Sequence, residues 1–182
     1  MQPIHQKHIT HTRRGLALAT SAFLSLAAVG CGSDSPLAPG LGSGSLTATG
    51  AVTASGSGLA VFQSISSGGT SLFQVVIAPV SQSATTWQLQ IANYSGRLSA
   101  GTYNLSPLSA SSSDPTASFY YTSGGTMQMF NSTSGQLVIT SSSSSSVRGT
   151  FTFTATDPAG GTSSVTAHGS FDAPCAPGIT CQ

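Results

Sequence analysis

The side chains that could carry out acid–base or nucleophilic chemistry are few and widely spaced along the 182 residues. Beyond residue 31 the chain has four aspartates, two arginines and a single histidine, His168. Hydrolysis of a glycoside needs two facing carboxylates, but Asp114 and Asp157 each precede a proline, a position typical of turns. We therefore expect no catalytic residue and no enzymatic activity.

A hydrolase that uses His168 with a serine and an aspartate is the alternative enzymatic interpretation. The chain contains no Gly-x-Ser-x-Gly sequence, the turn that exposes the nucleophilic serine of many hydrolases. A zinc site needs three or four protein ligands, and one histidine remains beyond the leader. We expect no bound metal and no cofactor.

The composition excludes several classes of protein. Charged residues make up 5% of the chain and the net charge is +1, so there is no basic surface for nucleic acid. Ser and Thr number 34 and 22, and there is no Glu to form the charged face of a helix. This composition excludes coiled coils and helical bundles and favours half-buried strands.

The first thirty residues have the organisation of a secretory signal peptide. Lys7, Arg13 and Arg14 precede an uncharged, largely apolar stretch over 15–30. The stretch ends in Leu-Ala-Ala-Val-Gly-Cys at 26–31, which resembles the lipobox of bacterial lipoproteins. That resemblance implies that Cys31 is diacylated and becomes the new N-terminus. The protein would then sit in the bacterial cell envelope with its lipid in the membrane, which in a Gram-negative cell is the outer membrane.

The other two cysteines support this interpretation of Cys31. Cys175 and Cys181 enclose a Pro-Gly turn and can pair with each other in an oxidising compartment, which leaves Cys31 as the unpaired thiol. Residues 31–44 are rich in Gly, Ser and Pro and are expected to form a flexible tether. A secreted protein without lipid, with a free thiol at Cys31, is the alternative.

Short runs of alternating apolar and polar residues follow the tether. In the run 150–156, Phe151, Phe153 and Ala155 point to one side and the threonines to the other. Two other runs alternate in the same way. Their apolar members are Trp87, Leu89 and Ile91 in one run, and Val165, Ala167 and Phe171 in the other. Further strands are expected near 46–54, 58–65, 71–79, 101–106, 116–122, 126–131 and 136–141. Gly-rich turns at 67–69, 123–125 and 157–161 should close hairpins.

About ten short strands without crossover helices indicate an all-β domain over 45–173, followed by a tail at 174–182. We predict an antiparallel β-sandwich of about 8–10 short strands, with a closed up-and-down barrel as the alternative. The segments Gly-Thr-Phe-Thr-Phe-Thr-Ala-Thr at 149–156 and Val-Thr-Ala-His-Gly-Ser-Phe at 165–171 resemble those of small bacterial lipoproteins of unknown function. That group has a lipobox, a Gly/Ser spacer and an all-β domain, and the resemblance implies no chemistry.

Aromatic side chains are the remaining candidates for binding. Trp87 and Phe119 follow the inward alternation and are expected in the core, whereas Tyr94 and Tyr120 are expected at the surface. Exposed tyrosines can stack on sugar rings. We expect a structural or ligand-binding module, anchored to the membrane through its N-terminal lipid, with an envelope glycan or protein as its partner. Surface adhesion is a further alternative, because the strands carry few charges that would block edge pairing.

Overall fold

The computed structural model describes residues 40–81, 83–108 and 113–182. Cys31, the predicted signal peptide and most of the predicted tether lie outside the described residues. The described residues form nine strands and no helix. The strands are β1 (Gly42–Gly50), β2 (Ala54–Ser67), β3 (Thr70–Pro79), β4 (Thr85–Asn93), β5 (Gly101–Asn104), β6 (Thr116–Ser123), β7 (Thr126–Ser142), β8 (Ser146–Thr156) and β9 (Ser164–Pro174). β1 begins three residues before the predicted start of the domain at 45.

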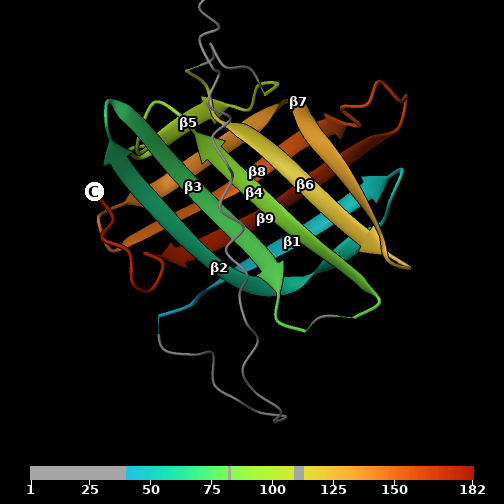
Figure 1. The fold of residues 1–182 in the computed structure, drawn as a ribbon, viewed down its shortest axis with the longest axis horizontal. Helices are drawn as coiled ribbons and strands as arrows, with labels where there is room; N and C mark the ends of the chain where they lie inside the picture. Colours follow the sequence, from blue (N-terminus) through green and yellow to red (C-terminus); the bar gives the residue numbers. More distant parts are fainter. Residues whose placement is uncertain (1–39, 82, 109–112) are drawn as a thin grey trace, which may run out of the picture. The chain divides into compact units, whose positions relative to one another are not determined.

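Eight of these strands form a closed antiparallel barrel (Figure 1). Strands β1, β2, β3, β4, β6, β7, β8 and β9 follow one another around the wall in chain order. The first strand then pairs with the last, from Ser43 opposite Asp172 to Gly50 opposite Val165. The short strand β5 is not one of these eight strands, but it belongs to the same sheet and pairs with the second half of β7.

The predicted β-sandwich is therefore wrong, and the barrel given as the alternative is correct. A sandwich of two separate sheets has edge strands with a partner on one side only. In the barrel each of these strands has a partner on both sides, β1 between β2 and β9 and β9 between β1 and β8. Alternation identifies the buried side of each strand but carries no information about whether the outermost strands meet.

The strands predicted at 126–131 and 136–141 are one continuous strand, β7. The sequence Asn-Ser-Thr-Ser-Gly at 131–135 has the composition of a turn, yet it stays in the sheet with a register shift between Ser132 and Ser134. Ser132 is buried, and its hydroxyl accepts the Ala117 N–H at 3.0 Å and donates to the Ser106 carbonyl at 2.7 Å. These bonds connect β7 to β6 and to the segment after β5, next to the point where the β6–β7 ladder ends at Asn131.

The predicted turns close the hairpins as expected. Gly68 and Gly69 have φ of 60° and 83° in the β2–β3 hairpin, and Gly124 and Gly125 have φ of 58° and 80° in the β6–β7 hairpin. Two consecutive positive φ angles define the two-residue turn whose twist matches the flanking strands. The six serines at 141–146 form the end of β7, a turn and the start of β8.

Side chains fill the interior of the barrel. Phe151 and Phe153 of β8, Val165 of β9 and Phe171 are at most 4% exposed, as the alternation predicts. Two of the phenylalanines lie opposite glycines: Phe151 faces Gly169, and Phe171 faces Gly149. A Cβ on Gly169 would lie 2.6 Å from the Phe151 ring and 2.0 Å from the Ser45 carbonyl oxygen. Large and small residues thus share the limited width between the walls.

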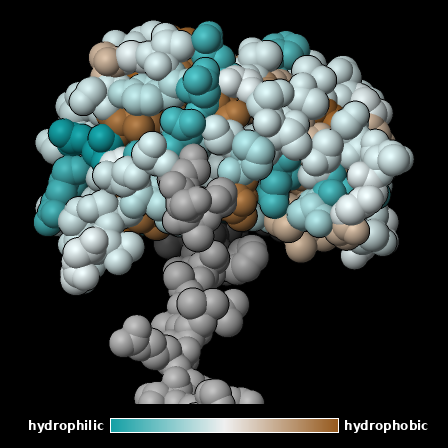
Figure 2. Space-filling view, turned by 90° about the horizontal axis from the view of Figure 1, so that it is seen from above, coloured by the Kyte–Doolittle hydropathy of each residue, from teal (hydrophilic) through white to brown (hydrophobic). Residues whose placement is uncertain are grey.

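The outer surface is nearly free of charge. Strands β1 to β7 contain no Asp, Glu, Lys, Arg or His. The face shown in Figure 2 is mostly pale, since Ser, Thr and Gly have intermediate hydropathy, with scattered strongly hydrophilic and hydrophobic residues. The few charged side chains of the strands lie on β8 and β9.

The C-terminal tail packs against the barrel at one end. Cys175 and Cys181 form the predicted disulfide, with Cα atoms 6.0 Å apart. The Ala176 and Gln182 N–H groups donate to the carbonyls of Phe62 and Ser64 in β2, at 2.8 and 3.1 Å. Ala176 and Cys181 are buried, so the tail is part of the folded domain.

Replacing an inward phenylalanine should cost far more stability than replacing its outward neighbour. Phe153→Ala should lower the free energy of unfolding by about 3–5 kcal/mol, through lost transfer energy and the cavity that remains. Thr152→Ala, on the exposed side of the same strand, should change it by less than about 0.5 kcal/mol. Chemical denaturation of both variants beside wild type provides the comparison. Equal midpoints would contradict the assignment of the inner face.

Removing the disulfide should loosen the tail and leave the barrel folded. Its loop is short, with a sequence separation of 6, so Cys175→Ser with Cys181→Ser should cost about 2 kcal/mol. Hydrogen exchange should accelerate at the amides of Ala176 and Gln182 and remain slow in β6. Two reactive thiols in the unreduced wild-type tail, counted by alkylation, would show that the disulfide does not form.

Candidate functional site

His168 lies on an open outer face of the sheet. It is exposed, and its neighbours across the strands are Thr47 of β1 and Thr152 of β8. The carboxylate on the same face of β9 is Asp172, four residues farther along, or roughly 13 Å at the usual strand rise. Among the residues that the structure describes, no aspartate other than Asp172 shares this face of β9 with His168, and the arrangement gives the hydrolase interpretation no support.

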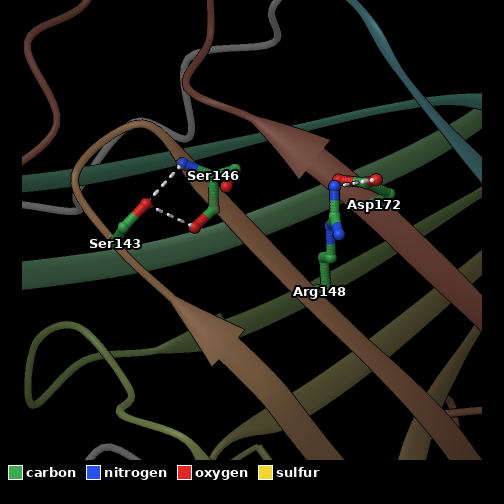
Figure 3. A network of polar contacts seen from close by, with 4 residues as sticks. All are labelled: Ser143, Ser146, Arg148 and Asp172. Atoms are coloured by element: carbon green, nitrogen blue, oxygen red, sulfur yellow. Dashed lines mark hydrogen bonds and ion pairs between the residues drawn. The ribbon is translucent and has the colours of Figure 1, made fainter.

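Asp172 is instead paired with an arginine. The Arg148 guanidinium lies 3.0 Å from the Asp172 carboxylate across the β8–β9 ladder (Figure 3). Nearby, the Ser143 hydroxyl accepts the Ser146 N–H at 3.1 Å and so stabilises the β7–β8 turn. Both partners of the ion pair are largely exposed, at 61% and 45%, so it contributes at most about 1 kcal/mol. These residues stabilise local structure and do not form a reactive group.

The aspartate at 157 behaves as a turn residue, as the sequence indicates. Its carboxylate accepts the Ala159 N–H at 2.8 Å in the β8–β9 turn. Among the described residues there is no group of three or more His, Cys, Asp or Glu side chains that could hold a metal ion. The same residues include no helix that is long and apolar enough to cross a membrane.

The two tyrosines predicted at the surface do not form one site. Tyr94 is 51% exposed and follows the end of β4, whereas Tyr120 is half-buried on the outer face of β6. Tyr120 lies opposite Gln88, which is six residues before Tyr94 on the chain. That separation is roughly 20 Å along the strand. The two rings cannot stack on the same sugar unit.

Tyr120 lies within an uncharged polar surface, here called the Tyr120 face. Its members are Gln88, Gln90, Ser118, Tyr120, Met129 and Asn131. Gln88 and Met129 flank the tyrosine on the adjacent strands, and the Ser118 hydroxyl donates to the Asn131 side-chain oxygen at 2.9 Å. The face offers one aromatic ring beside amide and hydroxyl groups, a combination that suits the C–H faces and hydroxyls of a sugar.

Two hollows lie at the end of the barrel away from the C-terminal tail. The β6–β7 and β8–β9 turns at this end are on the right in Figure 1. One, of about 300 Å³, is bordered by the β1–β2 and β3–β4 connections and by Trp87. The other, of about 360 Å³, lies between the start of β7 and the β8–β9 turn. The sequence assigned Trp87 to the core, and it is buried, but no sequence pattern revealed that it borders an opening.

Comparison with known proteins identifies a family for more than half of the chain. No curated protein and no solved structure matches it. Residues 70–173, which run from β3 almost to the end of β9, match the family described as Domain of unknown function (DUF6252). The all-β character expected from the alternating residues agrees with this match. The chain therefore belongs to the DUF6252 family, and its DUF6252 domain forms most of a closed antiparallel barrel.

Proposed function

We propose that this protein is a lipid-anchored module of the bacterial cell envelope whose barrel binds an envelope glycan without catalysing a reaction. The anchor rests on the lipobox-like sequence before Cys31 and on the pairing of the other two cysteines. Cys175 and Cys181 pair with each other, so Cys31 is the remaining cysteine of the sequence. Several acyl chains on that residue would hold the barrel at a membrane surface.

The observation that carries the binding role is the Tyr120 face. Aromatic and aliphatic side chains fill the barrel interior, so a ligand has to bind at the outer wall or at an end. Four strands that contribute to the wall around Tyr120, β3, β4, β6 and β7, carry no charged group. A neutral glycan can satisfy the amides and hydroxyls there without leaving a charge unpaired.

Edge-to-edge adhesion has less support than glycan binding. Adhesion of this kind needs strands with free edges and few charges. Closure of the barrel gives each wall strand a neighbour on both sides, so these strands have no free edge. The hydrolase interpretation has no carboxylate beside His168 within the described part of the chain to support it. We therefore favour glycan binding, which uses the Tyr120 face on the outer wall of the barrel.

The anchor is tested by fractionation of cells that express the full chain. Cys31→Ala should move the protein from the membrane pellet to the soluble fraction, since its acyl chains together provide stable attachment. Ser33→Ala, two residues farther on, serves as the control and should remain in the pellet. A Cys31→Ala protein that stays with the membrane, or an unmodified Cys31 in the mass spectrum, would refute lipidation.

The Tyr120 face is tested by cosedimentation with insoluble cell-wall glycan. Tyr120→Ala should weaken binding by about two- to tenfold, the loss expected for one aromatic contact of about 0.5–1.5 kcal/mol. Tyr94→Ala removes an exposed tyrosine elsewhere and should leave binding unchanged. Equal losses in both variants, or no cosedimentation of the wild-type protein, would contradict this role.

A further inference from the structure

The hollow beside Trp87 has a lining unlike that of the barrel interior. Five of its side chains carry hydroxyl groups: Thr53, Ser55, Ser81, Ser83 and Thr85. None of the lining residues carries a charge. Its volume of about 300 Å³ is at the lower end of the range for small-molecule sites. The space is large enough for a compact ligand of one or two rings.

Trp87 is the aromatic side chain that borders this hollow. The side chain is 8% exposed, yet its indole N–H makes no hydrogen bond to any group in the described part of the chain. Among the described residues, two buried side-chain atoms are sealed from solvent and lack a hydrogen-bond partner: Asn93 Oδ1 and Ser142 Oγ. The indole nitrogen of Trp87 is not one of them. The indole nitrogen is therefore in contact with solvent. A buried tryptophan usually pairs this donor, and the hollow is the opening that Trp87 borders.

Two of the five hydroxyl groups around the hollow contact other groups of the protein, and three can hydrogen-bond to a ligand. The Ser83 hydroxyl donates to the Thr85 carbonyl, and the Thr85 hydroxyl lies 3.4 Å from that of Ser123. The hydroxyls of Thr53, Ser55 and Ser81 make no hydrogen bond to other described residues. Each hydroxyl can both donate and accept, so this lining can pair with a ligand that presents hydroxyl groups of its own.

We propose that the hollow is a binding site for one or two rings of a neutral saccharide. The indole supplies an N–H donor beside an aromatic surface, and the surrounding hydroxyls supply donors and acceptors. An anionic or cationic ligand would find no counter-charge, and an aliphatic ligand would leave the hydroxyls unpaired. The site differs from the Tyr120 face, which lies on the outer wall, so either site can exist without the other.

The chain contains a single tryptophan, so its fluorescence reports directly on this hollow. The purified full chain is titrated with maltose, cellobiose and the dimer of N-acetylglucosamine. At least one of these sugars should produce a saturable change in emission with a shift to shorter wavelength. Saturation should also reduce quenching by acrylamide at least twofold, because the sugar covers the indole. No saturable change with any of the three sugars would overturn the proposal.

A matched pair of variants locates the site. Thr85→Val removes a hydroxyl from the hollow and should weaken binding at least fivefold, whereas Thr86→Val changes the next residue, on the outer face, and should alter it less than twofold. Equal effects of the two changes would overturn the proposal. A response that is lost in Tyr120→Ala and kept in Thr85→Val would also overturn it, while leaving the proposed function intact. A response that is lost in Thr85→Val and kept in Tyr120→Ala would support the hollow as the binding site.

Discussion

The ladder between β1 and β9 is the constraint on which the rest of the structure depends. Its eight residue pairs join segments about 120 residues apart, and they turn a meander of neighbouring hairpins into a closed wall. Without this ladder both strands would be open edges, and the side of the core under them would be exposed to water. The stretch that matches the DUF6252 family begins at β3, so β1 and β2 complete the barrel from outside that stretch.

Closure also determines where a ligand can bind. Eight strands enclose a space that side chains can fill, and here the phenylalanines of β8 and β9 use the room left by Gly149 and Gly169. The interior is thereby occupied, and the sites available for recognition are the outer wall and the ends. One end is covered by the disulfide-bonded tail, whose amides bond to β2. The opposite end has the two hollows, which gives the barrel two chemically different ends.

The sequence predicted the buried side of β4, β8 and β9, because alternation has the same period as the side chains of an extended chain. Phe153, Trp87 and Phe119 are buried as expected, and the glycine pairs close the hairpins as expected. The closure itself was not predictable from local patterns, since it depends on the pairing of β1 with β9. The continuity of β7 through Ser132 was missed because a buried serine with three hydrogen-bonding neighbours has the same local composition as a turn. For the candidate site, Tyr94 is exposed as expected and Tyr120 is half-buried. The separation of these two tyrosines and the hollow beside Trp87 depend on tertiary structure.

Closure of the barrel is tested most directly by nuclear Overhauser effects between its first and last strands. Leu46 lies opposite Gly169, and Ala48 lies opposite Ala167. The barrel predicts backbone contacts for both pairs, as strong as those within the β2–β3 hairpin, for example between Gln63 and Gln74. Hairpin contacts without any contact between β1 and β9 would mean that the sheet is open, and would contradict the closed barrel.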